Sequence, residues 1–233
     1  MRVAAAPARW GVDPLPPAWR GGQGPRLWTA PVGAFAARAH ALSALLDDGE
    51  RARCGALRRA ADRDRYRVAH VALRQLLGAY LGRDPAQVRF APEACPGCGG
   101  PHGRPAVAGP PPVPLHFSLS HAGDAVLIAF ADTPVGVDVE ERPTPEAAGE
   151  VAGLLHRSER AELAALPPSE LPAAVGRCWA RKEAYLKGVG IGLGEDPSVT
   201  YVGTGAEPAD VPGWSVTDVP TFPGYAAACA VRR

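Results

Sequence analysis

The segment VGVDVE at 135–140 holds two acidic residues at a spacing that lets them act together. Side chains alternate between the two faces of a β-strand, so the three valines are predicted to point into a core and Asp138 and Glu140 to point the other way. Two carboxylates on one face repel each other unless a cation lies between them, and Mg²⁺ prefers oxygen ligands of this kind. The alternative is a strand that becomes polar as it reaches solvent.

A later segment, 178–193, is predicted to begin as a helix and to end in a glycine-rich loop. Trp179, Glu183 and Lys187 are spaced four residues apart and therefore line one helix face. Glu183 could complete a metal site, and Lys187 could neutralise a phosphate or give a proton to a leaving group. The alternative is a surface ion pair, which stabilises a helix by only about 0.3–0.5 kcal/mol. The glycines follow the helix instead of preceding it, so they do not form a dinucleotide-binding fingerprint.

Two further segments carry groups suited to phosphate. A predicted strand ends at Ser120 and His121, just before Gly123, where a hydroxyl and an imidazole could bind a phosphate oxygen or only shape a turn. A Ser–His nucleophilic pair is not favoured, because neighbours on a strand point to opposite faces and no GxSxG motif is present. Arg104 precedes Pro105 and is a cation presented on a rigid turn.

The loop between the predicted strands at 88–90 and 115–119 contains Cys95, Cys98 and His102. These three side chains could bind zinc, but a structural zinc site needs a fourth ligand, from Cys54, Cys178 or a distant group. The interpretation that we favour is a reduced loop rich in proline and glycine. The chain has 5 cysteines, an odd and small number, which indicates a reducing compartment.

The composition sets limits on function. The chain has 233 residues with a formal net charge of +1, which argues against bulk electrostatic binding of nucleic acid. No run of 18 apolar residues is present, and the N-terminus lacks the apolar segment of a signal peptide. We therefore expect a cytoplasmic protein with no membrane and no nucleic-acid partner.

The predicted elements follow the order β, α, α, β, β, β, β, α, α, β, β, β, after an extended lead-in over 1–25. This order indicates an α+β fold of two halves, 1–133 and 134–233, each pairing helices with a small sheet. The predicted strands are 26–32, 88–90, 115–119, 125–131, 135–140, a piece around 199, 214–219 and 225–231. The predicted helices are 34–46, a strongly periodic one from Asp62 to a stop at Gly82, 145–165 and 171–187.

In combination and in this order, the motifs are specific. SLSHAGD at 118–124, GVDVE at 136–140 and WARKEAYLKG at 179–188 resemble the Sfp-type 4′-phosphopantetheinyl transferases. Those enzymes carry (V/I)G(V/I)D(V/I)E followed later by W-x-x-K-E-x-x-x-K. The segment GRP at 103–105 also resembles its counterpart there, and the chain length fits the family's monomeric members built of two halves.

The resemblance implies a fold and a reaction. The two α+β halves would be related by pseudo-twofold symmetry, with coenzyme A bound in the cleft between them. The enzyme would transfer 4′-phosphopantetheine from coenzyme A to a serine of an apo acyl or peptidyl carrier protein, with Mg²⁺, and release 3′,5′-ADP. Asp138, Glu140 and Glu183 match the family's magnesium ligands. Lys187 matches its lysine near the diphosphate, and our hypothesis is that Glu183 and Lys187 are the catalytic pair.

The resemblance also implies the residues that contact coenzyme A. Ser120, His121 and Arg104 match residues at the phosphates, and Arg51 matches a basic residue near the 3′-phosphate. A nearby family position that is often basic falls at Cys54 here. Substitutes for that missing charge are Arg53, Arg58 and Arg65.

Two other classes use the same residues differently. A magnesium-dependent nucleotide or diphosphate hydrolase would use the same carboxylates and would need no carrier protein. A zinc-binding interaction module would use the loop at 95–102.

Overall fold

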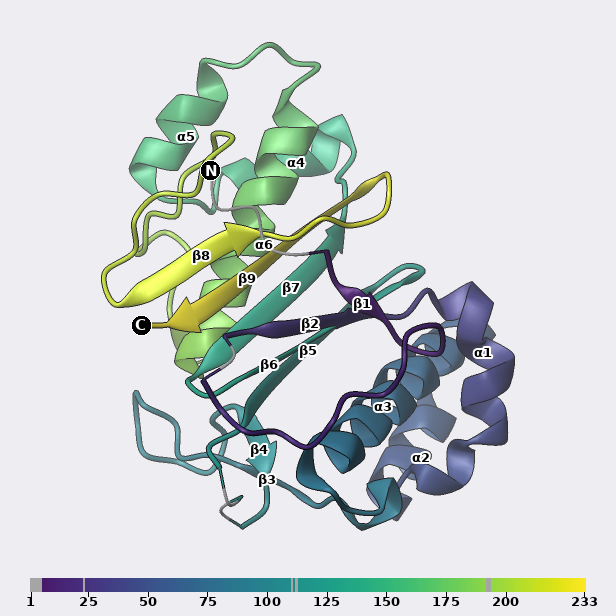
Figure 1. Ribbon diagram of the computed structural model, residues 1–233. Coiled ribbons are helices and arrows are strands. Elements are labelled where there is room, and N and C mark those ends of the chain that lie inside the picture. The colour runs from purple at the N-terminus through teal and green to yellow at the C-terminus, as the bar shows by residue number, and fades with distance from the viewer. Residues whose placement is uncertain (1–5, 23, 110, 112, 192–193) are drawn as a thin grey trace.

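The computed structural model describes residues 6–22, 24–109, 111, 113–191 and 194–233, and these form an α+β protein (Figure 1). One sheet has the strand order β1-β2-β6-β5, a second has the order β7-β9-β8, and β3 pairs with β4 in a small hairpin. All pairs are antiparallel except β1 with β2. The strands are β1 Ala8–Arg9, β2 Arg26–Thr29, β3 Phe90–Pro92, β4 Pro105–Val107, β5 His116–Ala122, β6 Ala125–Ala131, β7 Val135–Glu141, β8 Trp214–Asp218 and β9 Tyr225–Arg232. The α-helices are α1 Val32–Ala41, α2 Asp48–Ala56, α3 Ala60–Leu81, α4 Pro145–Ala152, α5 Arg157–Ala164 and α6 Leu171–Val189.

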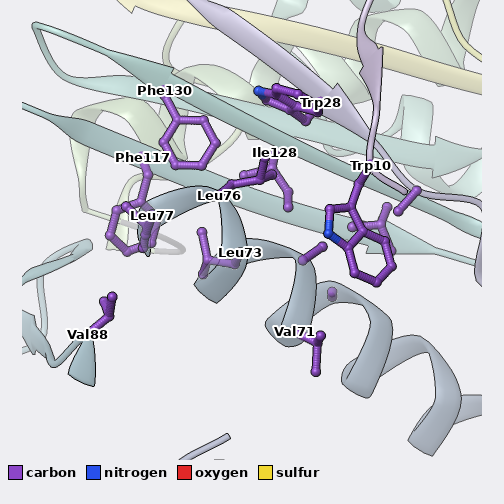
Figure 2. Close-up of a cluster of buried hydrophobic side chains, with 14 of the residues drawn as sticks. Trp10, Trp28, Val71, Leu73, Leu76, Leu77, Val88, Phe117, Ile128 and Phe130 are labelled. Carbon is purple, nitrogen blue, oxygen red and sulfur yellow. The ribbon is translucent and has the colours of Figure 1, made fainter. Parts of the chain in front are cut away.

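The predicted periodic helix is confirmed as α3, which begins two residues earlier than expected and ends at Gly82. Gly82 adopts φ 62°, and its N–H bonds to carbonyls of the last turn, which is how glycine commonly ends a helix. Figure 2 shows Leu73, Leu76 and Leu77 of α3 among the aromatic and aliphatic side chains of β5 and β6. Their burial fixes α3 against the first sheet.

The described part of the lead-in expected over 1–25 has little regular structure but packs against the core. Trp10 is fully buried in the core around α3, as Figure 2 shows, and its indole donates a hydrogen bond to Gln75 Oε1 at 3.0 Å. Trp19 is also buried and donates to Asp132 Oδ1 at 2.8 Å. Burial of two indoles stabilises this segment on the domain in spite of its prolines.

The second sheet and α6 position the acidic motif. Val135, Val137 and Val139 are all buried, as the alternation in the sequence predicts, and they join a cluster with apolar residues of β6 and β9. On the other side, α6 lies so close to β7 that a Cβ added at Gly136 would stand 1.9 Å from the carbonyl oxygen of Ala184. The glycine of GVDVE therefore lets the strand and the helix meet backbone to backbone.

Three predicted elements are corrected by the structure. The helix expected over 145–165 is two helices, α4 and α5, because the chain turns at 153–156 and His156 caps the second one. The helix expected over 34–46 is α1 followed by a short 3₁₀ turn, Ser43–Leu45. No strand forms around Val199, where Asp196 instead closes a turn by accepting from the Ser198 and Val199 N–H groups.

The remaining differences are elements that the sequence did not predict, among them α2 and β4, and shifted element ends. The loop expected over 91–114 contains β4, which pairs with β3. The strand expected over 26–32 ends at Thr29, and Val32 begins α1 instead. Among the described residues, no helix combines the length and the apolar character that crossing a membrane requires.

Candidate active site

The structure brings Asp138 of β7, Lys187 of α6 and Ser120 of β5 into one hydrogen-bonded group. Lys187 Nζ lies 2.6 Å from Asp138 Oδ1 and 3.0 Å from Ser120 Oγ. Ser120 Oγ donates to the same Asp138 oxygen at 2.8 Å. A second serine of β5, Ser118, accepts from the backbone N–H of Val137 at 3.0 Å and so ties β5 to β7. The group thus spans three elements that are far apart in sequence.

The other oxygen of Asp138 is in a different situation. Asp138 is only 1% exposed, and its Oδ2 is buried with no hydrogen-bond partner among the described residues. A buried carboxylate oxygen without a donor is costly, because its hydration is lost and nothing replaces it. A cation at this position would satisfy the oxygen.

Glu140 and Glu183 share the electrostatic field of Asp138. Loss of hydration raises the pKa of Glu140 to about 7, and the negative charges of Asp138 and Glu183 act in the same direction. Burial also raises the pKa of Glu183, again with a contribution from Asp138. Lys187 opposes both shifts without cancelling them. The three predicted metal ligands therefore face one another closely enough to repel, which is the situation that a divalent cation relieves.

The three carboxylates are not yet gathered around a single point. Within the described part of the chain, only Cys95, Cys98 and His102 bring three ligand atoms within 4.8 Å of one another. The acidic residues therefore fit a cation by charge and by the orphaned Asp138 oxygen, but at least one of their side chains must change rotamer to share it.

Arg104 reaches the same region from the β3–β4 hairpin. Its guanidinium donates to the carbonyl oxygen of Gly188 at 2.6 Å and pairs with Glu93 Oε2 at 2.6 Å. Arg104 and Lys187 both line a pocket of about 350 Å³, whose apolar wall includes Phe117 and Leu119. The structure thus places two of the predicted cations at one pocket.

His121 lies on β5 next to Ser120 and is surrounded by positive charge. Desolvation of the ring lowers its pKa, and the charges of Arg65, His70 and Lys187 act in the same direction. Arg65 also donates to the carbonyl oxygen of Gly123, in the turn that follows β5. This cluster favours an anionic ligand, since an anion would offset the repulsion among its members.

Comparison with known proteins identifies the family. A family model described as the 4′-phosphopantetheinyl transferase superfamily matches residues 134–212, which include Asp138, Glu140, Glu183 and Lys187. The chain is 31% identical over 216 residues to the 4′-phosphopantetheinyl transferase HetI of Nostoc sp., and the match covers 88% of this chain and 86% of HetI.

The chain belongs to the 4′-phosphopantetheinyl transferase superfamily. It is 27% identical over 146 residues to the transferase Sfp of Bacillus subtilis, which covers 62% of this chain and 60% of Sfp. It is 37% identical over 90 residues to the transferase AcpT of Escherichia coli K12, a match that covers 38% of this chain and 45% of AcpT. The resemblance stated from the motifs is confirmed, and the protein is a 4′-phosphopantetheinyl transferase.

A second pocket of the transferase, of about 360 Å³, adjoins the first. The two share Pro105, Phe117 and Leu119 as lining residues, and the second adds Arg53 and His70. These last two come from α2 and α3, so the two pockets together extend from α6 to α2 and α3.

The structure does not bring Arg51 or Arg58 to either pocket of the transferase. The guanidinium of Arg51 pairs with exposed Asp48 at 2.6 Å and also contacts the carbonyl oxygen of Leu46. Arg58 is exposed in the link between α2 and α3. Arg53 is the arginine of α2 that lines a pocket, and it is one of the arginines named above as substitutes for the charge missing at Cys54.

Proposed function

We propose that this transferase moves 4′-phosphopantetheine from coenzyme A to a serine hydroxyl of an apo acyl or peptidyl carrier protein, with Mg²⁺, and releases 3′,5′-ADP. The observation that carries the proposal is Asp138, whose Oδ1 is held by Lys187 and Ser120 while its buried Oδ2 has no partner among the described residues. The relatives HetI, Sfp and AcpT, all named 4′-phosphopantetheinyl transferases, support the transfer itself.

Asp138, Glu140 and Glu183 would hold the magnesium ion. When bound, the ion supplies positive charge at the diphosphate, where negative charge grows as the bond to the leaving group breaks. The fit is supported by the orphaned oxygen of Asp138 and by the pKa values of Glu140 and Glu183, which burial raises first and the repulsion among the carboxylates raises further.

Glu183 would accept the proton of the carrier serine. The serine oxygen then forms a bond to the phosphorus that bears pantetheine, and the bond from this phosphorus to the oxygen of 3′,5′-ADP breaks. A carboxylate that is ionised near neutral pH can act as such a general base, and a cation that offsets the repulsion from Asp138 would keep Glu183 ionised. Lys187, held by Asp138 and Ser120, would neutralise the leaving oxygen or donate a proton to it.

Coenzyme A would lie along the two adjoining pockets. Arg104, Ser120, His121 and Lys187 would contact its diphosphate, and Arg104 and Lys187 already line one wall. For the 3′-phosphate, Arg53 is the stronger candidate by position because it lines the second pocket. Two other candidates, Arg51 and Arg58, would need side-chain movement to reach the pockets. Arg65 is also a candidate, because it lies near the turn after β5.

We also propose that 1–133 and 134–233 are two similar halves related by pseudo-twofold symmetry. The support is that each contains a mainly antiparallel sheet with a long helix packed on it, α3 in the first and α6 in the second (Figure 1). The group formed by Ser120, Asp138 and Lys187 lies where β5 of one half meets β7 of the other.

The test is intact-mass spectrometry of purified apo carrier proteins after incubation with coenzyme A and Mg²⁺. We expect a gain of about 340 Da on the carrier, the mass of the transferred group, and no gain when Mg²⁺ is chelated. Release of 3′,5′-ADP from coenzyme A with no carrier present, and no gain of mass on any carrier, would support the hydrolase and overturn the proposal.

A further inference from the structure

The β3–β4 hairpin carries a group of potential metal ligands outside the acidic site. One sulfur atom each from Cys95 and Cys98 and one ring nitrogen of His102 all lie within 4.8 Å of one another. Cys98 Sγ is 3.0 Å from His102 Nε2. Two thiols and an imidazole are the ligand types that Zn²⁺ prefers.

The backbone around these side chains is folded into a tight turn. The N–H of Gly99 bonds to the carbonyl of Cys95, and the N–H of Cys95 bonds to the carbonyl of Gly100, both at 2.8 Å. Gly99 adopts φ 73°, a conformation that glycine reaches without strain. The turn directs the backbone N–H groups of Cys98 and Gly97 at the Cys95 sulfur.

The space inside the turn is kept free by a second glycine. A Cβ added at Gly100 would stand 3.1 Å from His102 Nε2 and 3.3 Å from Cys98 Sγ. Any larger residue would therefore press on two of the three ligand side chains. A glycine here leaves the inner side of the ligand group open.

The sequence named Cys54 and Cys178 as sources of a fourth ligand, and the structure excludes both. Cys54 lies in α2, where its thiol contacts the carbonyl oxygen of Arg63. Cys178 is buried in the cluster around α6. Three protein ligands with Cys98 and His102 exposed leave one tetrahedral position to solvent.

We propose that Cys95, Cys98 and His102 bind a Zn²⁺ ion with a water molecule as the fourth ligand, and that this ion holds the turn that presents Arg104. His102 is two residues before Arg104. The turn is joined to the hairpin by bonds from Gly103 N to Glu93 O and from Glu93 N to Arg104 O, both at 2.9 Å. The ion would therefore limit the positions open to Arg104 at the pocket; this positioning role rests on the proposed function, whereas zinc binding does not.

The test of binding is metal analysis of the full chain purified under reducing conditions. We expect about one zinc ion per chain in the wild type. Cys98→Ser and His102→Gln should each lose most of the zinc. Cys229→Ala is the matched control, because this cysteine is buried in β9 between alanines and should leave the zinc content unchanged. Cobalt added to the metal-free protein should give thiolate-to-metal absorption in the wild type and the control.

Absence of zinc together with absence of a cobalt signal in the reduced protein would overturn the proposal. An intact mass about 2 Da lower, which a disulfide between Cys95 and Cys98 would produce, would overturn it too. The zinc and cobalt measurements use neither coenzyme A nor a carrier protein, so their outcome does not depend on whether the transfer assay succeeds.

The positioning role has its own readout. Removal of zinc should increase amide hydrogen exchange across 93–105, and Cys98→Ser should raise the KM for coenzyme A more than it lowers kcat. Hydrogen exchange and KM that are both unchanged without zinc would overturn the positioning role.

Discussion

The ammonium group of Lys187 lies 2.6 Å from Oδ1 of Asp138, although 49 residues separate them. The pairing joins a residue of α6 to a residue of β7 and offsets the cost of burying the carboxylate. The two oxygens of Asp138 differ in their contacts. Oδ1 is bound by Lys187 and Ser120, whereas Oδ2 has no protein partner among the described residues. A cation bound at Oδ2 would therefore satisfy the buried oxygen of Asp138 that lacks a partner.

Replacing Glu183 by glutamine should lower turnover by at least about 10², because an amide cannot accept the proton of the carrier serine. The rate of holo-carrier formation at saturating coenzyme A measures the effect. Glu207→Gln is the control, since Glu207 is exposed and distant in sequence from the acidic motif. Near-normal turnover in Glu183→Gln would remove Glu183 from the role of base.

Replacing Gly136 by alanine should destabilise the protein by about 3 kcal/mol or more. The added Cβ would stand 1.9 Å from the Ala184 carbonyl and 2.4 Å from the Gly188 nitrogen, both backbone atoms of α6. Urea unfolding measures the free energy of unfolding. The control is Gly149→Ala in α4, where nothing lies within 4 Å and where alanine should instead stabilise by about 0.5–1 kcal/mol. An equal change in the free energy of unfolding in Gly136→Ala and Gly149→Ala would contradict the close contact between β7 and α6.

Replacing Lys182 by methionine should lower the free energy of unfolding by about 3–5 kcal/mol, because it leaves a buried carboxylate without its counter-charge. Lys182 is 1% exposed and lies 2.9 Å from fully buried Glu159. Adding Glu159→Gln should restore part of the loss. Arg233→Met, which breaks an exposed ion pair with Asp210, should cost less than about 1 kcal/mol. If Lys182→Met lowers the free energy of unfolding no more than Arg233→Met does, the buried ion pair of Lys182 and Glu159 is contradicted.

Replacing Glu140 by glutamine should stabilise the metal-free protein above pH 7. The pKa of Glu140 rises from 4.5 to about 7 on folding, so the unfolded chain ionises first as pH rises. This lowers the stability of the wild type between pH 4.5 and 7, and the penalty stays constant at higher pH. We expect the free energy of unfolding of Glu140→Gln to exceed that of the wild type by on the order of 1–3 kcal/mol at pH 8. This difference should vanish as pH falls through 4.5. Thermal unfolding in EDTA at a series of pH values measures it, and a difference that does not depend on pH would contradict the shift.

Local patterns in the sequence predicted much of the fold. The strand over 125–131 is β6 with the same bounds, and the alternating valines of β7 are buried as expected. The helix ending at Gly82 is also correct. These elements were predictable because their apolar spacing and their stop signal act within a few residues.

Other features depend on partners that are far away in sequence. Arg74 is a charged residue of the periodic helix α3, yet it is fully buried, with bonds to Glu50 at 2.6 Å and Asp47 at 2.7 Å. Periodicity cannot reveal such a buried ion pair, because each charge is buried only when the other is present. The start of α2 was detectable, since Asp47 and Glu50 form a capping box.

The candidate site likewise contains residues that the sequence predicts and residues that only the structure reveals. The residues Asp138, Glu140, Glu183 and Lys187 could be named from their motifs, and the structure brings them together. The involvement of Arg53 and His70 in the second pocket could not be predicted, because it depends on how α2 and α3 lie against β5.

The most direct test of the central claim, that one divalent cation binds at Asp138, is titration of the protein with Mn²⁺ in the presence of coenzyme A, followed by electron paramagnetic resonance. We predict about one tightly bound Mn²⁺ ion per chain, lost in Asp138→Ala and weakened in Glu140→Gln and Glu183→Gln, with Glu207→Gln unchanged. Binding of Mn²⁺ to Asp138→Ala with the affinity and stoichiometry of the wild type would contradict it.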